Sequence, residues 1–333
     1  MVSRERQKIL GSFGLLTVAL VMAMAAALFS ACAKPPQELR ISSLLWPGYE
    51  PLVLAETLNY FDEAPIRVLD YLSNTDAMAA FKNHRLEAGA FTLDETLQLL
   101  ADGVDVQVVL IMDTSHGGDV IVANPDIASV KALKGHAVAV ESSAVGAYVL
   151  QRALDLNGLT LDDIRVKTTH AMEQKQAFEH GQVAAAVSFD PYRTQLLQTG
   201  KHTIFDSTQI ADEILDVLVV RTDVIEQSPE LVRTLVAGWF KALDYQRRYP
   251  ENAAGYALPR YKVSLETYLD SLSGLRFTSL AKNQRLLAPS DSPLHALEPK
   301  LKKALIKLGL VDAALQETAL LKGHLNHAFL PTP

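Results

Sequence analysis

Two aspartates occupy equivalent positions in a short internal repeat, and carboxylates placed in this way can bind a positively charged or hydrogen-bond-donating group. Residues 80–94 end in Thr92-Leu93-Asp94, and residues 177–190 end in Ser188-Phe189-Asp190, so each copy reads as helix end, apolar strand, hydroxyl, apolar residue and aspartate. Because unpaired carboxylates are costly to bury, the pair favours an amine or another polar donor over a purely anionic solute. Each aspartate is also placed to cap the following helix, a role that needs no ligand.

A second group of residues combines aromatic surface with a helix start. Trp46 and Tyr49 offer rings for the apolar part of a solute, and Gly48 allows close approach of the backbone. The alternative is that Trp46 fills part of the hydrophobic core and contacts no ligand. Ser142 and Ser143 open a helix, where free N–H groups favour a sulfonate or carboxylate, although serine is also an ordinary N-cap.

The remaining candidates lie in turns that follow predicted strands. His116 either donates to a ligand or caps the connection between two lobes. The expected ligand-binding residues are Trp46, Gly48, Tyr49, Thr92, Asp94, Ser115, His116, Gly117, Ser142, Ser143, Asp190, Tyr192 and Asp216. His324 and His327 have no third ligand beside them, so we expect no metal site. We also expect no cofactor and no catalytic residue, because no nucleotide, zinc-hydrolase or nucleophile-elbow motif occurs.

Short apolar runs that alternate with amphipathic stretches predict the elements that position these residues. Strands are expected near Leu39–Leu45, Arg67–Tyr71, Glu87–Phe91, Val106–Met112, Asp119–Ala123, Ala137–Val140, Arg165–Thr168, Val183–Val187, Thr203–Asp206 and Val217–Arg221. Helices are expected near Pro51–Asn59, Asp76–Asn83, Leu93–Ala101, Val145–Leu156, Met172–His180 and Tyr192–Gln198, followed by a helical block with Pro229–Arg248, Ser264–Leu275 and Leu297–Leu308. Such alternation predicts parallel sheets, and ligands bind beyond the carboxyl ends of parallel strands.

The order of these elements predicts an α/β protein with two lobes. Residues 39–118 and 222–333 would form the first lobe, and residues 119–221 would form the second. Gly117-Gly118 would carry the chain out of the first lobe, and Leu215–Arg221 would bring it back. Two crossing segments make a hinge, and hinge closure over a ligand is a known motion of two-lobed binding proteins.

Composition excludes several other classes. The chain has 333 residues, of which 49% are hydrophobic and 21% charged, enough for two ordinary domains and unlike a disordered chain. Its formal net charge of -7 argues against a nucleic-acid binder, which needs a basic surface. Its single cysteine excludes an intrachain disulfide.

Residues 1–32 are predicted to be an export signal. Three basic residues before position 9 precede Ile9–Phe29, a run that contains no charged residue. The segment Leu28-Phe29-Ser30-Ala31-Cys32 resembles the lipobox of bacterial lipoproteins, which implies cleavage before Cys32 and acylation of its thiol. The alternative is a buried Cys32 at the end of an uncleaved membrane helix. Both interpretations place the body on the periplasmic side of a bacterial membrane, with residues 33–38 as a tether.

Four further segments resemble the substrate-binding proteins of nitrate/taurine-type (NitT/TauT) ABC transporters, which include binders of aliphatic sulfonates and thiamine precursors. They are Trp46-Pro47-Gly48-Tyr49-Glu50-Pro51, Gly103-Val104-Asp105-Val106, Asp113-Thr114-Ser115-His116-Gly117-Gly118-Asp119, and Leu133-Lys134-Gly135 before Ala137–Val140. The resemblance extends from about Leu39 to Arg248. It implies a type II periplasmic-binding-protein fold with two lobes, two crossovers and no catalysis.

We therefore expect a monomeric lipoprotein that captures a small polar organic solute between its lobes and delivers it to an ABC permease. The solute would be a sulfonate, an amine-bearing acid or a pyrimidine. One alternative is a ligand sensor whose closed form signals to a membrane protein. A less favoured alternative is an enzyme resembling the pyrimidine synthases of thiamine formation, but their chemistry uses a cysteine-rich segment, and no cysteine follows Cys32 here.

Overall fold

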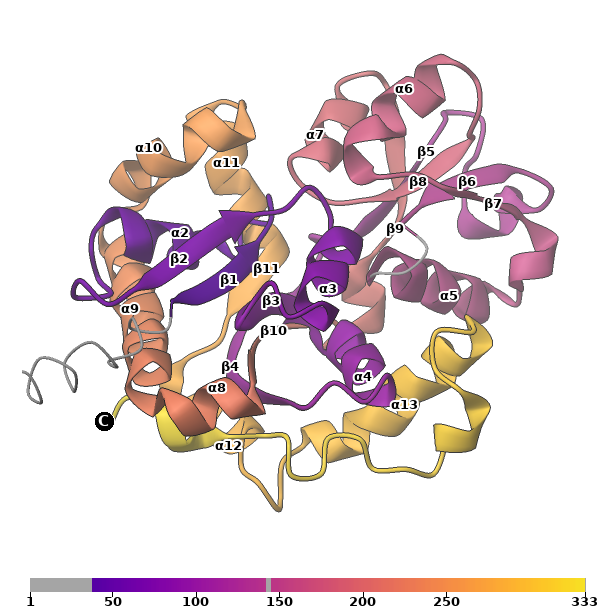
Figure 1. Cartoon of the computed structure of the whole chain (residues 1–333). Helices are drawn as coiled ribbons and strands as arrows, with labels where there is room; N and C mark the ends of the chain where they lie inside the picture. The colour runs from indigo at the N-terminus through magenta and orange to yellow at the C-terminus, as the bar shows by residue number, and fades with distance from the viewer. Residues whose placement is uncertain (1–37, 142–144, 333) are drawn as a thin grey trace, which may run out of the picture. The chain divides into compact units, whose positions relative to one another are not determined.

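The computed structural model describes residues 38–141 and 145–332, in which two β-sheets are flanked by helices (Figure 1). The predicted signal segment with Cys32, residues 33–37 of the tether, Ser142 and Ser143 lie outside the described residues. Within residues 38–141 and 145–332, no helix is both long and apolar enough to cross a bilayer.

The first sheet has six strands in the order β11-β4-β10-β3-β1-β2. Their bounds are β1 (Leu39–Ser43), β2 (Ile66–Asp70), β3 (Ala88–Thr92), β4 (Val106–Ser115), β10 (Leu215–Arg221) and β11 (Leu275–Phe277). Strand β1 pairs in parallel with β2 and β3, whereas β10 runs antiparallel to both β3 and β4. The sheet is therefore mixed, and the expectation of parallel sheets is wrong here, as it is for the second sheet.

The second sheet has five strands in the order β7-β6-β8-β5-β9. Their bounds are β5 (Val120–Ala123), β6 (Ala137–Val140), β7 (Arg165–Thr168), β8 (Ala185–Ser188) and β9 (His202–Asp206). Strand β6 pairs in parallel with β7 and β8, and β5 runs antiparallel to β8 and β9. Both sheets thus place one antiparallel strand, β10 or β5, beside a set of three parallel strands.

The internal repeat in the sequence corresponds to this shared topology. Strand β3 has one parallel neighbour, β1, and one antiparallel neighbour, β10, while β8 has β6 and β5 in the same roles. Each of these strands follows a helix and leads into another: α3 (Asn74–Lys82) and α4 (Leu93–Ala101) flank β3, and α6 (Gln174–Glu179) and α7 (Tyr192–Leu197) flank β8. The repeat therefore marks the same position in both lobes.

The other helices complete both lobes. They are α2 (Glu50–Thr57), α5 (Val145–Asn157), α8 (Thr222–Gln227), α9 (Pro229–Arg248), α10 (Pro250–Tyr261), α11 (Leu265–Ser271), α12 (Leu280–Leu286) and α13 (Leu294–Lys307). Helix α9 begins and ends where its apolar spacing predicts, and it buries Trp239 and Leu235 completely. Its buried face packs against α2 of the first lobe.

Strand β10 differs from its predicted place. The sequence analysis put residues 215–221 at the end of the second lobe, but β10 pairs with β3 and β4 in the first sheet. The chain therefore returns to the first sheet before residue 215. An antiparallel strand whose residues are all buried has the same apolar pattern as a parallel one, so the sequence does not show which sheet receives it.

The C-terminal region also departs from the prediction that strands stop after Arg221. Strand β11 adds three residues to the edge of β4, and the helix expected over Ser264–Leu275 ends as α11 at Ser271. Strand β11 is too short to show a period-2 pattern, which is why the sequence analysis missed it. It covers only the end of β4, at Asp113, Thr114 and Ser115.

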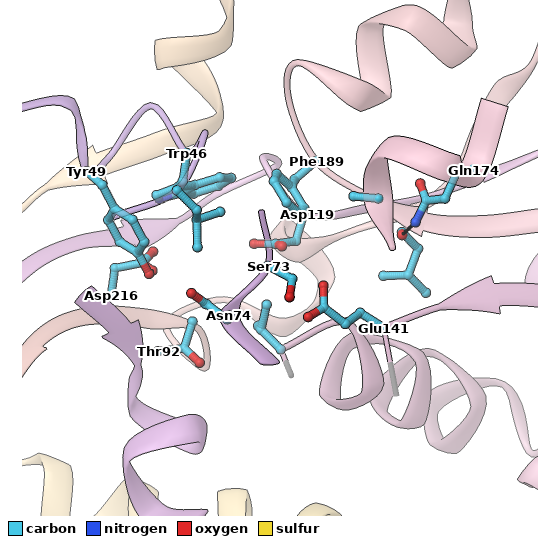
Figure 2. A pocket seen from close by; sticks show the side chains of 15 residues that line it. Trp46, Tyr49, Ser73, Asn74, Thr92, Asp119, Glu141, Gln174, Phe189 and Asp216 are labelled. Atoms are coloured by element: carbon cyan, nitrogen blue, oxygen red, sulfur yellow. Dashed lines mark hydrogen bonds between the residues drawn. The ribbon is translucent and has the colours of Figure 1, made fainter. Parts of the chain in front are cut away.

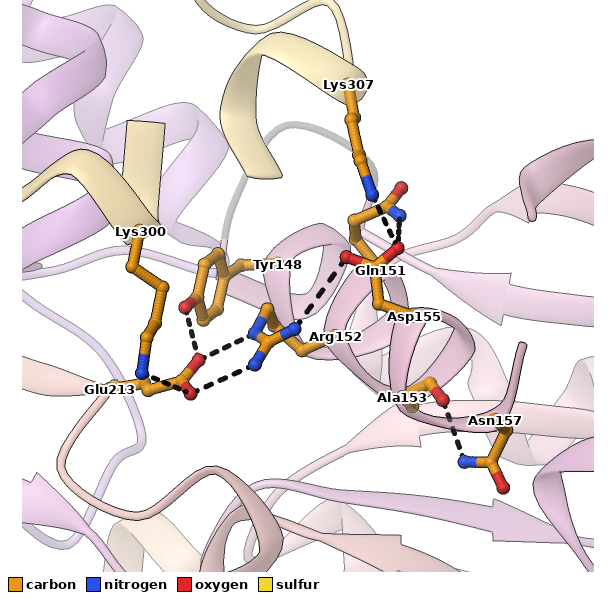
Figure 3. A network of polar contacts seen from close by, with 9 residues as sticks. All are labelled: Tyr148, Gln151, Arg152, Ala153, Asp155, Asn157, Glu213, Lys300 and Lys307. Atoms are coloured by element: carbon orange, nitrogen blue, oxygen red, sulfur yellow. Dashed lines mark hydrogen bonds and ion pairs between the residues drawn. The ribbon is translucent and has the colours of Figure 1, made fainter. Parts of the chain in front are cut away.

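Helix α13 bridges the two lobes instead of covering only the first, because it packs against both α4 and α5. Figure 3 shows the polar contacts on the second-lobe side. Glu213, in the segment that returns to β10, accepts hydrogen bonds from Arg152 of α5 at 2.7 Å and from Lys300 of α13 at 3.3 Å. Lys307 of α13 pairs with Asp155 of α5 at 2.7 Å. Any change in the angle between the lobes must move these ion pairs.

We predict that Asn283→Ala lowers the free energy of unfolding by about 2–4 kcal/mol. Asn283 is fully buried on α12; its oxygen accepts from the Ile111 N–H at 2.7 Å, and its amide donates to the Ile111 carbonyl at 2.9 Å. The variant leaves both backbone groups of β4 unsatisfied next to β11. Equilibrium urea unfolding measures the change. Exposed Asn252→Ala on α10 is the control, and a loss for Asn283→Ala no larger than that of the control would contradict the prediction.

Candidate functional site

A cleft lies where the ends of strands from both sheets meet, and residues of both lobes line it (Figure 2). Its empty volume is about 630 Å³ with the solvent at its mouth included, and about 40 Å³ of this can hold the centre of a water molecule. The lining residues are Leu44, Trp46, Tyr49, Ser73, Asn74, Thr92, Asp119, Glu141, Val145, Gly146, Ala171, Gln174, Val187, Phe189 and Asp216. In this arrangement the cleft therefore admits only a small group.

Trp46 follows β1 and is held between two glycines and an acid. Its indole N–H donates to the Asp113 carboxylate at 3.4 Å. A Cβ on Gly48 would come within 1.9 Å of the same carboxylate, and a Cβ on Gly118 would come within 2.5 Å of the indole ring. Both glycines are therefore needed for the ring to lie where it does. Trp46 is 6% exposed and still lines the cleft, so it contributes to both the core and the site.

Tyr49, the N-cap residue of α2, contacts one of a pair of buried acids. Its hydroxyl donates to Asp216 on β10 at 2.6 Å. Asp216 is the cross-strand partner of Asp113 on β4, and each of the two carboxyls shifts the pKa of the other. Burial raises the pKa of Asp113 to about 7, and burial together with the neighbouring Asp113 charge raises the pKa of Asp216 well above its usual range. The pair therefore retains a proton near neutral pH.

The two crossover segments lie side by side behind the cleft. The Ser115 and Ser207 hydroxyls are 2.8 Å apart, and the Ser207 hydroxyl also accepts from the Gly117 N–H at 2.6 Å. Gly117 has a φ of +97°, a conformation that favours glycine. The Asp119 N–H donates to Ser115 at 3.2 Å, and burial raises the pKa of the Asp119 carboxyl to about 6. The crossovers thus fix the place of Asp119 at the start of β5.

Glu95 of α4 joins the lobes below the cleft. Its carboxylate accepts from the Thr92 N–H at 2.9 Å, from the Asn74 amide at 2.8 Å and from the Val145 N–H at 3.1 Å. Val145 is the first residue of α5 in the second lobe. The Glu95 carboxylate therefore accepts a hydrogen bond from an N–H at the start of this helix. The sequence analysis expected an anionic ligand at this helix start.

A second contact crosses from the first lobe to Glu141. The backbone N–H and the hydroxyl of Thr75, in the first turn of α3, donate to the Glu141 carboxylate at 3.1 and 2.5 Å. Glu141 follows β6 and lines the cleft. With the bond from Val145 to Glu95, this contact joins the edges of the two lobes, so the structure has a closed arrangement.

The structure brings part of the predicted set together. Trp46, Tyr49, Thr92 and Asp216 line the cleft, whereas Gly48, Ser115 and Gly117 lie behind it in the contacts described above. The other predicted residues outside the lining are Asp94, His116, Asp190 and Tyr192.

The four residues outside the lining have local roles. Asp190, which precedes the N-cap Pro191, accepts from the Thr194 N–H in the first turn of α7 at 3.1 Å, and Asp94 lies in the buried first turn of α4. The His116 ring contacts Arg276 of β11 at 2.6 Å. Tyr192 packs edge-to-face on Phe189, with ring centroids 5.6 Å apart. The helix-start alternative therefore describes Asp190, whereas Thr92 is the N-cap of α4 and Asp94 lies inside that helix. Neither aspartate of the repeat belongs to the cleft lining.

The sequence analysis missed several lining residues, both polar and apolar. Ser73 and Asn74 open α3, Glu141 follows β6, and Gln174 begins α6. A usable signal existed, because each stands at a strand end or a helix start on the predicted ligand edge. Phe189 and Asp119 lie in segments that the sequence analysis named. It selected Asp190 and Tyr192 in the segment of Phe189, and Ser115, His116 and Gly117 in the segment of Asp119.

The described residues contain no group of three or more histidine, cysteine or acidic side chains placed to hold a metal ion. The lining has three carboxylates, and no lysine, arginine, histidine or cysteine occurs among the described lining residues. The chemistry that this arrangement supports is the binding of a solute by hydrogen bonds, charge and aromatic contact.

The fold is that of the periplasmic binding proteins, as the solved structures show. The alkanesulfonate-binding protein SsuA from Xanthomonas axonopodis pv. citri, bound to MOPS, superposes with a TM-score of 0.70 at 16% identity, over 84% of this chain and 96% of that chain. The desulfurization enzyme DszB superposes with a TM-score of 0.62 at 18% identity, over 88% of this chain and 98% of that chain. The predicted fold class is confirmed.

The chain belongs to the NMT1-like family, whose family model matches residues 32–258. A relative from Escherichia coli (strain K12), described as a putative aliphatic sulfonates-binding protein, is 26% identical over 208 residues. The alignment covers 59% of this chain and 63% of that relative's length. The resemblance inferred from four sequence segments is thereby confirmed at the level of family and fold.

We predict that Asp216→Asn stabilises the ligand-free protein at pH 8 and not at pH 4. The pKa values of Asp113 and Asp216 are raised in the folded state, so the folded protein binds more protons than the unfolded chain between about pH 4 and pH 7. Stability of the native protein must therefore fall as the pH rises through this window. Asparagine keeps an acceptor for Tyr49 and supplies a permanent donor to Asp113, so we expect a gain of about 2 kcal/mol or more at pH 8.

Urea unfolding at both pH values measures this difference. The exposed loop variant Asp291→Asn is the control and should behave like the native protein at each pH. An Asp216→Asn protein that is less stable than the native protein at pH 8 would show that the pair is ionised and stabilised by another group.

Proposed function

We propose that this protein captures a small solute in the cleft between its lobes and delivers it to an ABC permease on the periplasmic side of a bacterial membrane. The observation that carries the proposal is that strand ends of both sheets contribute to one cleft lining, with Trp46, Tyr49 and Asp216 from the first lobe and Asp119, Glu141 and Phe189 from the second. A solute held by both lobes stabilises the closed form by its contacts with the two sides together.

The comparisons support a role as a solute-binding protein, but they do not identify the solute. The E. coli relative and the SsuA structure carry names that describe binding of sulfonates, and at these identities their ligands do not transfer to this chain. We further propose that Cys32 is the lipid-bearing N-terminus and that the protein works as a tethered monomer. Labelling of the expressed protein with radioactive palmitate, and its loss in Cys32→Ser, tests the anchor.

We propose that the chain is a binding protein and not an enzyme. The likeness to DszB concerns the fold, which binding proteins and enzymes share. The described lining contains no cysteine, histidine or lysine that would act as nucleophile or as the base of a nucleophile–base pair. The alternative of a ligand sensor would use the same cleft, and loss of solute uptake on deletion of the gene distinguishes transport from sensing.

We predict that a thermal-shift screen of sulfonates, amino acids, pyrimidines and amines identifies a solute that raises the melting temperature. Trp46→Ala should then weaken binding of that solute about tenfold or more in calorimetry, because the variant removes the ring from the cleft. Tyr256→Ala, an exposed residue of α10, is the control. Equal affinity of the native and Trp46→Ala proteins would place the binding site elsewhere.

A further inference from the structure

The polar lining of the cleft is acidic on both sides. Asp216 comes from the first lobe, and Asp119 and Glu141 come from the second (Figure 2). Asp119 is 5% exposed and Asp216 is 3% exposed. The groups that donate to Asp216 and Glu141 are uncharged: the Tyr49 hydroxyl donates to Asp216, and the Thr75 N–H and hydroxyl donate to Glu141. No ion pair among the described residues neutralises any of the three.

Two buried amides in the lining present free acceptors. The Asn74 amide nitrogen donates to both oxygens of Glu95, at 3.1 and 2.8 Å, and the Gln174 nitrogen donates to the Val187 carbonyl at 2.6 Å. These bonds set the orientation of each amide. Asn74 is 7% exposed and Gln174 is 1% exposed, and the oxygen of each has no hydrogen-bond partner among the residues that the structure describes. Only a donor on the solute, or water, can satisfy them.

The donors of the lining are, by contrast, mostly used within the protein. The Trp46 indole donates to Asp113, the Tyr49 hydroxyl donates to Asp216, and the Ser73 hydroxyl donates to Asp76 at 2.9 Å. Both amide nitrogens are engaged as described above. The Thr92 hydroxyl is the exception, because it has no partner among the described residues. An anionic solute would therefore find few free donors in the described lining and would face three carboxylates.

Aromatic rings complete the lining. Phe189 stands edge-to-face to Trp46, with centroids 6.1 Å apart, and Tyr49 adds a third ring. Aromatic faces attract cations and also cover apolar carbons. A ring-lined space with carboxylates and free carbonyl oxygens matches an ammonium group on a short apolar body.

We propose that the solute is a small organic cation whose protonated amine lies between the carboxylates of Asp119, Glu141 and Asp216 and donates to the free amide oxygens. This inference rests on the proposed function, since it names the solute class of the same cleft. It departs from the sulfonates named for similar proteins, because their charge has the wrong sign for this lining. The space available in the closed arrangement restricts the solute to a small one.

The number of protons released or taken up on binding distinguishes a cationic solute from an anionic one. The titratable groups on the elements around the cleft include Tyr49, Asp94, Glu95, Asp113, Asp119, Glu141 and Asp216, with Asp76, Tyr148 and Tyr192 on neighbouring helices. Burial raises the pKa of Asp119 to about 6 and that of Asp113 to about 7. A bound cation favours the ionised carboxylates and so releases protons near pH 6.5, whereas a bound anion favours their protonated forms and so takes protons up.

The test is calorimetric titration of the purified full-length protein with alkylammonium and alkanesulfonate ions of matched chain length, from ethyl to hexyl, in buffers of different ionisation enthalpy. We expect alkylammonium ions to bind saturably at concentrations up to about 10 mM. Protons should be released on binding. Asp119→Asn and Asp216→Asn should each weaken binding about tenfold or more. Exposed Glu179→Gln, on α6 of the second lobe, is the matched control and should bind like the native protein.

The outcomes separate the two proposals. Binding of an alkanesulfonate with proton uptake, abolished in Trp46→Ala, would overturn the cation and retain the solute-binding function. Alkylammonium binding that is unchanged in both aspartate variants would also overturn the cation site. If neither series binds, and amino acids and pyrimidines also fail to bind, both proposals are overturned. The linkage measurement uses the native protein, so it decides the sign of the charge even if an aspartate variant fails to fold.

Discussion

Burying acids at the end of a sheet constrains the rest of the site. Asp113 and Asp216 are partners on adjacent antiparallel strands, both almost fully buried, and two ionised carboxylates cannot share so dry a space. The protein meets this constraint with a shared proton, the Tyr49 hydroxyl and the Trp46 indole. Gly48 has no side chain because any Cβ there would collide with Asp113. The turn after β1 is thus shaped by the acids that it covers.

The same electrostatic condition extends to the second lobe. Asp119 is buried where the chain crosses over, and Glu141 is held by a threonine from the opposite lobe. Negative charge therefore accumulates where the lobes meet, and closure brings it together. Free energy of closure must come from contacts that offset this repulsion, including the ion pairs of α13 with the second lobe and whatever solute the cleft accepts. In a two-lobed fold of this kind, the charge of the solute therefore affects the free energy of lobe closure.

The family relationship and the site chemistry answer different questions. Membership of the NMT1-like family and the superposition on SsuA and DszB establish the architecture, which other binding proteins and an enzyme share. Discrimination among solutes depends on a few side chains at strand ends. In this chain those side chains are acidic or expose carbonyl oxygens, as at Asn74 and Gln174. The fold is therefore common to many ligands, and the lining determines which of them is bound.

The sequence by itself determined the alternation of strands and helices, the internal repeat and the edge of the sheets at which the cleft lies, because apolar periodicity and turn residues are local properties. It predicted Trp46, Tyr49, Thr92 and Asp216 in the cleft, and α9 from its first residue to its last. Tertiary structure alone decided that β10 joins the first sheet and that both aspartates of the repeat remain outside the cleft lining. Those outcomes depend on pairing and packing between segments far apart in the chain, which no local pattern records.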